Sequence, residues 1–305
     1  MVIKRRLRSV AGGLLALATV AALAGCGTSR ATTAGVTVVA AENFWGSIAS
    51  QIAGERANVQ SIITNPAQDP HDYEPTANDA RVLAISQLAI VNGVGYDPWA
   101  AKLLAANPDS KRIVLTVGSL FKLHTGDNPH RWYSPADVNS FAYYLTADLS
   151  KLDPKHADYY ASRLASFETK ALHPYHQLIT QIKNRYKGVR VGASESIFAL
   201  QAPALGLTLI TPPTFMKAIS EGTEVSAHDA ITTQAQIARH QIKVWIYNSQ
   251  NATPQIQRLT ALARANHIPI VTITESLTPA TASFEQWQVA QLDRIARALH
   301  QATGR

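Results

Sequence analysis

In each of two regions of the chain, short runs rich in β-branched residues alternate with longer amphipathic runs, and this pattern limits the folds that the chain can adopt. Helical runs separate the strand-like runs, and this order implies parallel pairing through right-handed crossovers. We therefore predict an α/β protein with two lobes, each built on a mainly parallel sheet flanked by helices. The strand-like runs are 36–39, 59–63, 88–91 and 113–115 in the first half, and 189–191, 207–210, 244–247 and 268–273 in the second.

Between these two regions lies a stretch of sequence without strand-like runs. Residues 135–152 and 154–186 both have helical spacing. A helix of about 30 residues reaches roughly 45 Å, enough to run along both lobes, although Pro174 should kink it or move its boundary. We predict an N-terminal lobe at 36–135, a helical linker with a long backbone helix at 136–187, and a C-terminal lobe at 188–305.

The amino terminus has the pattern of an export signal. Basic residues at positions 4, 5, 6 and 8 precede an apolar run that is too short to span a bilayer. The run ends at Leu23-Ala24-Gly25-Cys26, which resembles the lipobox of bacterial lipoproteins. We predict a signal peptide at 1–25, lipidation of Cys26, a tether at 26–35, and a position on the outer face of the cytoplasmic membrane, at the cell surface or in the periplasm. The alternative is an ordinary export signal with an incidental cysteine.

Charge and cysteine content exclude several classes of function. Removing the leader takes away four basic residues and no acidic ones, so the formal charge of +7 falls to about +3. A nucleic-acid partner is therefore not expected. Cys26 is the single cysteine, so neither an intrachain disulfide nor a thiolate metal cluster can form.

Two similar phrases each place a histidine directly after a proline. His71 lies in Asp69-Pro70-His71-Asp72-Tyr73-Glu74-Pro75, and His130 lies in Asn128-Pro129-His130-Arg131-Trp132-Tyr133-Ser134-Pro135. The prolines stiffen both loops, and ordered ligands favour metal binding. We predict that the two imidazoles form half of one metal site. The alternative is that each histidine is a solvated loop residue.

These phrases, together with Ala193-Ser194-Glu195-Ser196-Ile197-Phe198 and Thr272-Ile273-Thr274-Glu275-Ser276-Leu277, resemble the ligand loops of a known family. It is the family of metal-binding receptors, called cluster A-I, that serve bacterial ABC importers for zinc and manganese. The resemblance implies two α/β lobes bridged by one long helix, with the ion in the cleft between the lobes. It also implies four metal ligands: His71 and His130 from the first lobe, and Glu195 and Glu275 from the second.

Two features of the second lobe qualify this resemblance. Glu275 stands where most members have aspartate, so its reach differs by one carbon. Asn248, in the stretch Ile246-Tyr247-Asn248-Ser249-Gln250, is expected to orient a ligand without binding the ion. Each glutamate also has a structural alternative, since Glu195 could stabilise a helix N-terminus and Glu275 could be an exposed turn residue.

Two imidazoles and two carboxylates suit zinc, manganese or ferrous iron, and they exclude copper(I). Together with this ligand set, the resemblance implies a monomeric extracytoplasmic receptor that captures such an ion and delivers it to an ABC permease, without catalysis. The alternatives are a receptor for a siderophore or tetrapyrrole and a metallohydrolase, although the sequence has no His-Glu-x-x-His motif. Because ligation needs neutral imidazole, affinity should weaken as pH falls through about 6.5.

Overall fold

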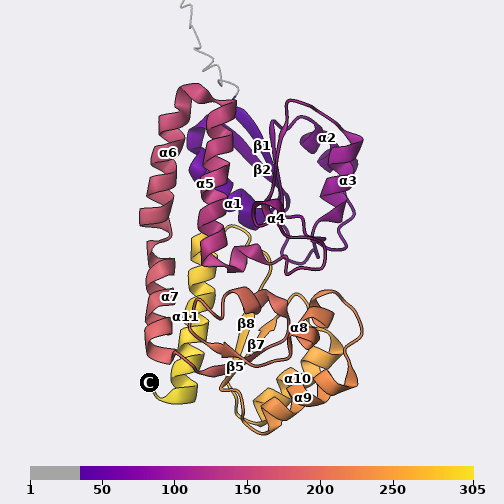
Figure 1. Cartoon of the computed structure of the whole chain (residues 1–305), viewed down its shortest axis with the longest axis vertical. Coiled ribbons are helices and arrows are strands. Elements are labelled where there is room, and N and C mark those ends of the chain that lie inside the picture. Colours follow the sequence, from indigo (N-terminus) through magenta and orange to yellow (C-terminus); the bar gives the residue numbers. More distant parts are fainter. Residues whose placement is uncertain (1–34) are drawn as a thin grey trace, which may run out of the picture. The chain divides into compact units, whose positions relative to one another are not determined.

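The computed structural model describes residues 35–305, and it contains two four-stranded parallel sheets (Figure 1). The predicted signal peptide at 1–25, Cys26 and the tether up to residue 34 lie outside the described residues. The first sheet has the order β2-β1-β3-β4, and the second repeats that arrangement as β6-β5-β7-β8. The prediction of two α/β lobes is confirmed. The strands are β1 (Val36–Glu42), β2 (Ala57–Ile63), β3 (Leu88–Val91), β4 (Ile113–Thr116), β5 (Arg190–Ala193), β6 (Thr208–Leu209), β7 (Val244–Asn248) and β8 (Ile270–Ile273).

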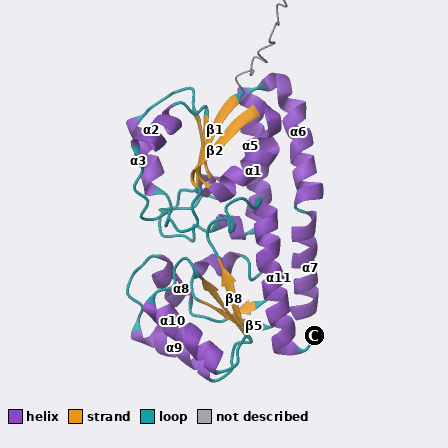
Figure 2. Cartoon of the chain, turned by 180° about the vertical axis from the view of Figure 1, so that it is seen from behind, coloured by secondary structure: helices purple, strands orange, loops and turns teal. Residues whose placement is uncertain are grey.

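Helices cover both faces of each sheet (Figure 2). Strand β3 is buried at all four positions, as expected of a central parallel strand between helical layers. Helices α2 and α11 begin with capping boxes at Thr76 and Ser283. The flanking helices are α1 (Asn43–Ala53), α2 (Ala77–Ala84), α3 (Pro98–Ala106), α4 (Val117–Leu120) and α5 (Pro135–Leu152) in the first lobe, and α8 (Pro213–Ser220), α9 (Ala227–Ala238), α10 (Pro254–Ala265) and α11 (Phe284–Thr303) in the second.

After the first strand of the second lobe, the apolar spacing of the sequence predicts a helix at 196–205, which is much shorter in the structure. The run at 196–205 forms only a 3₁₀ helix over Ser196–Leu200, followed by turns. Pro203 lies inside this window, and proline cannot donate the hydrogen bond that would continue a helix. Helix α8, which begins at Pro213, is present without having been predicted.

The helical linker consists of consecutive segments in place of one uniform helix. Helix α6 (Ala157–Ser166) continues into a π-helical turn over Phe167–Ala171 and then into α7 (His173–Tyr186). Pro174 has no N–H and its ring obstructs the turn before it, which explains why the helix changes its winding here. The boundary expected near Pro174 is therefore confirmed. Helix α6 packs on α5, and α7 packs on α11 (Figure 1).

A row of buried aromatic side chains joins the cores of the two lobes. Phe44 of α1 stacks on Trp132 with ring centroids 3.9 Å apart. Trp132 contacts Tyr133, and Tyr133 in turn meets Trp287 of α11 edge to face at 5.9 Å. These side chains belong to one hydrophobic cluster that contains residues of both sheets. Among the described residues, no helix is both long enough and apolar enough to cross a membrane.

Candidate metal centre

Both histidine loops use the same local turn. The backbone N–H of His71 donates to Oδ1 of Asp69 at 2.9 Å, and the backbone N–H of His130 donates to Oδ1 of Asn128 at 3.1 Å. In each case a short polar side chain bonds the backbone two residues later, across an intervening proline. The repeated Asx-Pro-His sequence thus produces a repeated backbone conformation, which fixes where each imidazole starts.

The structure brings three of the predicted ligands together. One nitrogen from each of His71 and His130 and one carboxylate oxygen of Glu275 all lie within 4.8 Å of one another. His71 follows β2 and Glu275 follows β8, so the group draws on the carboxyl ends of strands in both sheets. Ligand sites in parallel α/β sheets form at these ends.

His130 presents a neutral imidazole with one nitrogen already oriented. The residue is 1% exposed, and its Nδ1 lies 2.9 Å from Oδ1 of Asn128. Because the amide oxygen can only accept, Nδ1 carries the hydrogen and Nε2 keeps a free lone pair. Burial, aided by the nearby His71, lowers the pKa of His130 to about 3. Protonation of this histidine therefore does not supply a change near pH 6.5, because burial disfavours its charged form.

Glu275 is held from both lobes. It is 7% exposed, so the alternative of an exposed turn residue is wrong. Its Oε2 accepts from the hydroxyl of Tyr96 at 2.9 Å, and its Oε1 accepts from Nδ2 of Asn248 at 2.6 Å. Burial and then the charge of Glu275 raise the pKa of Tyr96 well above its usual value, so the phenol keeps the proton that it donates.

Glu195 lies next to this group without being part of it. Its Oε1 accepts from the same Nδ2 of Asn248 at 2.6 Å, and its Oε2 accepts from Nδ2 of Asn251 at 2.9 Å. The residue stands at the N-terminal end of a 3₁₀ helix, and its side chain makes no capping hydrogen bond there. Asn248 therefore bridges the two predicted carboxylate ligands.

The paired carboxyl groups make the site electrostatically suited to a cation. Burial and then repulsion by Glu275 raise the pKa of Glu195 well above its usual value. Burial also raises the pKa of Glu275, although the neighbouring His71 opposes this effect. Two buried carboxyl groups that cannot both ionise freely would be stabilised by a dication placed beside them.

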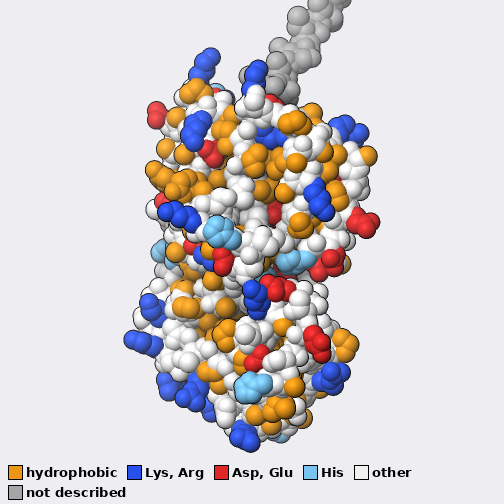
Figure 3. All heavy atoms as spheres, turned by 45° about the vertical axis from the view of Figure 1, so that its right-hand side comes forward, with side chains coloured by type: hydrophobic (Ala, Val, Ile, Leu, Met, Phe, Trp, Pro, Cys, Tyr) orange, Lys and Arg blue, Asp and Glu red, His pale blue; other side chains and the backbone are white. Residues whose placement is uncertain are grey.

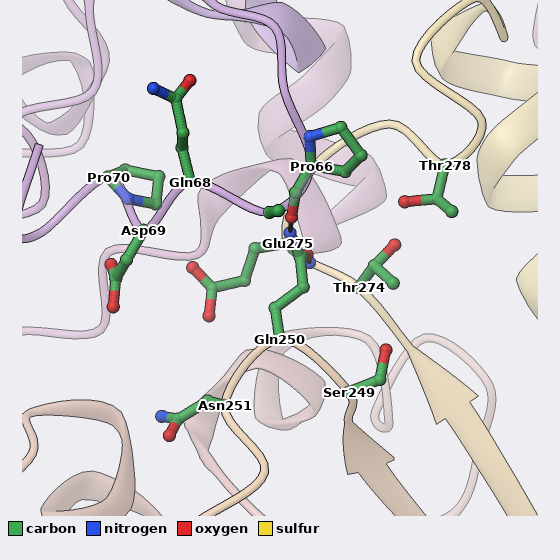
Figure 4. A pocket seen from close by; sticks show the side chains of 11 residues that line it. Pro66, Gln68, Asp69, Pro70, Ser249, Gln250, Asn251, Thr274, Glu275 and Thr278 are labelled. Atoms are coloured by element: carbon green, nitrogen blue, oxygen red, sulfur yellow. Dashed lines mark hydrogen bonds between the residues drawn. The ribbon is translucent and has the colours of Figure 1, made fainter.

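Cavities flank the group on two sides, and residues of both lobes line each of them. One cavity, of about 450 Å³, contains Glu275, Asp69 and Gln250 (Figure 4). Another, of about 430 Å³, contains His71 and Asn128. On the face drawn in Figure 3, histidine and acidic side chains gather at the level where the lobes meet. Solvent can thus approach the candidate centre from either side.

Sequence reasoning missed four residues that orient these groups. Asn128 lies in the phrase that contains His130, and Gln250 lies in the stretch that contains Asn248. Their closeness in sequence to these two residues could have indicated their role. Tyr96 and Asn251 belong to loops without a distinctive pattern. The role of Tyr96 depends on how the lobes meet, and that of Asn251 depends on a contact with Glu195, 56 positions away in the same lobe. Spacing along the chain reveals neither contact.

Comparison with known proteins places the chain among metal-binding receptors. Over 151 residues the chain is 27% identical to the manganese-binding lipoprotein MntA of Halalkalibacterium halodurans, covering 47% of this chain and 50% of that protein. Over 299 residues it is 23% identical to the metal ABC transporter substrate-binding lipoprotein FimA of Streptococcus parasanguinis, covering 90% and 93%. For several curated relatives, MntA included, the chain spans about half of their length.

A solved structure shows the same fold. It is the manganese-bound periplasmic metal binding protein from Candidatus Liberibacter asiaticus, with a TM-score of 0.71 and 18% sequence identity. The match covers 87% of this chain and 99% of that chain. A family model described as "zinc-uptake complex component A periplasmic" matches residues 38–298, which include all the candidate ligands and both sheets except the first two residues of β1. The chain therefore belongs to the zinc-uptake complex component A family, ZnuA.

Proposed function

We propose that this protein captures a divalent transition-metal ion outside the cytoplasmic membrane and delivers it to the permease of an ABC importer. The observation that carries the proposal is the convergence of His71, His130 and Glu275, which come from both lobes. Membership of the family and the metal-binding lipoproteins among its relatives support it. The function requires binding and release, and no bond in the cargo is broken.

In this proposal His71 and His130 supply nitrogen ligands and Glu275 supplies an oxygen ligand. Glu195 joins as the fourth ligand when the ion draws the two carboxylates together. Asn248 supports this assignment because its Nδ2 already lies 2.6 Å from one oxygen of each carboxylate. Such a set suits zinc, manganese or ferrous iron.

The protein acts as a monomer attached to the membrane through lipidated Cys26. Its body then remains beside the permease, and the tether before residue 36 lets the lobes reach it. Support for this part comes from the leader sequence and from the lipoprotein relatives.

Calorimetric titration of chelator-stripped protein with Zn²⁺ and Mn²⁺ tests the proposal. We expect one tight site, and we expect the double variant His71→Ala/His130→Ala to lose it. The matched control is His173→Ala/His228→Ala, which removes two exposed histidines and should bind like the wild type. Unchanged affinity in the His71/His130 variant would refute the assignment. Elemental analysis of protein purified without added metal then identifies the cargo, because zinc outcompetes manganese in simple titrations.

A further inference from the structure

We propose that Gln250 is a latch between the lobes that positions Glu275 and slows release of the bound ion. The inference rests on the proposed function and adds a residue to it. Gln250 ends the stretch Ile246-Tyr247-Asn248-Ser249-Gln250, in which only Asn248 was predicted to have a role.

The side chain of Gln250 bonds both lobes at once. Its Nε2 donates to the backbone carbonyl of Pro66, in the loop that leads to His71. Its Oε1 accepts from the backbone N–H of Glu275 at 2.5 Å and from that of Ser276 at 3.1 Å. Figure 4 shows the side chain extending from the second lobe toward Pro66. One amide thus connects the loops of two candidate ligands.

The backbone of Gln250 ties this latch to the carboxylate pair. Its N–H donates to Oδ1 of Asn248 at 3.0 Å. Asn248 uses its other side-chain atom, Nδ2, to bond Glu195 and Glu275. A movement of the second lobe that breaks the bond to Pro66 therefore also disturbs the residue that aligns both carboxylates.

A second amide makes a comparable link on the other side of the centre. Nδ2 of Asn128 donates to the carbonyl of Ser196 at 2.8 Å, while its Oδ1 serves His130. Asn128 lines one flanking cavity and Gln250 lines the other. The candidate centre therefore lies between two polar links, each joining a ligand loop of one lobe to the opposite lobe.

The bond from Gln250 to Pro66 can form only when the two lobes are together. It should therefore oppose the separation that releases the ion and leave the first encounter with the ion unaffected. Its loss should raise the dissociation rate constant more than it lowers the association rate constant.

The variant Gln250→Glu separates the two halves of the latch. An ionised glutamate can still accept from the N–H groups of Glu275 and Ser276, but it cannot donate to Pro66. The added negative charge would by itself hold a cation more tightly, so faster release would come from the contact between the lobes, through the lost bond and the repulsion between the carboxylate and the Pro66 carbonyl oxygen. Gln250→Met, which removes the bonds on both sides, is the second variant.

The experiment is stopped-flow release of Zn²⁺ from loaded, full-length protein into excess chelator at pH 7.5. We expect Gln250→Glu to release zinc roughly three- to tenfold faster than wild type, the range for loss of one neutral hydrogen bond. Gln250→Met should release it faster still. The matched control is Gln257→Glu, because the exposed Gln257 donates to the carbonyl of Ala252 within its own lobe and should leave the rate unchanged.

The outcomes separate the latch from the proposed function. If wild-type protein binds no zinc, the proposed function fails and the latch fails with it. If wild type binds zinc and Gln250→Glu releases it at the same rate or more slowly, the latch alone is refuted. If Gln250→Glu changes association and dissociation equally, or lowers thermal stability with unchanged kinetics, Gln250 supports the fold and is not a latch.

Discussion

Replacing Glu195 with glutamine tests the electrostatic account of the carboxylate pair. Glu195 is 1% exposed, and burial together with the charge of Glu275 raises its pKa well above the usual value. Below the pKa that Glu195 has in the unfolded chain, its carboxyl group is protonated in both the folded and the unfolded state, so it does not reduce the free energy of unfolding. As pH rises toward the folded-state pKa, the unfolded state gives up its proton first, and the metal-free protein loses stability.

The size of this loss follows from the proton affinity. Each tenfold difference in proton affinity between folded and unfolded states corresponds to about 1.4 kcal/mol of stability. Glutamine cannot ionise, so Glu195→Gln should lack this part of the decline and be more stable than wild type at pH 8 to 9. It should also bind metal more weakly, by at least the roughly 10- to 100-fold that loss of a residue orienting a metal ligand costs, since it removes one of the two negative charges offered to the ion. The two effects have opposite signs.

Urea denaturation of metal-free protein between pH 5 and 9 measures the first effect, and calorimetric titration with Zn²⁺ measures the second. The control is Glu224→Gln, an exposed glutamate of the same lobe that should change neither quantity. The reasoning is refuted if wild type and Glu195→Gln lose stability in parallel as pH rises.

Three further perturbations follow from the structure. Zinc affinity should fall between pH 8 and pH 5, because the raised pKa values of Glu195 and Glu275 let protons compete with the ion. His130, with a pKa of about 3, stays neutral over this range. Calorimetry in two buffers of different ionisation enthalpy counts the protons released on binding, and a count of zero contradicts this account. Tyr96→Phe, which removes the donor to Oε2 of Glu275, should weaken zinc binding about three- to tenfold, while the exposed Tyr143→Phe control should not. Phe44→Ala, at a fully buried ring stacked on Trp132, should cost about 3–5 kcal/mol in urea denaturation, and a loss under about 1 kcal/mol would show that the ring is not part of the core.

Much of the fold could be predicted because its signals are local. The alternation of strand and helix patterns predicts parallel sheets from neighbouring residues alone. Pro174 predicts a helix boundary because its ring cannot be accommodated inside a regular helix. The helix expected at 196–205 failed because Pro203 outweighs apolar spacing in a short segment.

The candidate centre divides in the same way. His71 and His130 could be identified from the sequence because three consecutive residues, Asx-Pro-His, form the turn in each loop. The contacts of Tyr96 and Gln250 join residues 179 and 184 positions apart, and no pattern of neighbouring residues encodes such pairs. The low pKa of His130 likewise arises from burial, which only the folded structure provides.

The aromatic row from Phe44 to Trp287 has a consequence for transport. Packed rings tolerate sliding over a small range only, because larger displacement opens voids and loses dispersion contacts. Under the proposed function, thermal fluctuations of the aromatic contact between the lobes would release the metal ion only rarely. Unloading would then depend on mechanical work done by the transporter on the docked receptor, which ties consumption of the importer's energy to delivery of the ion.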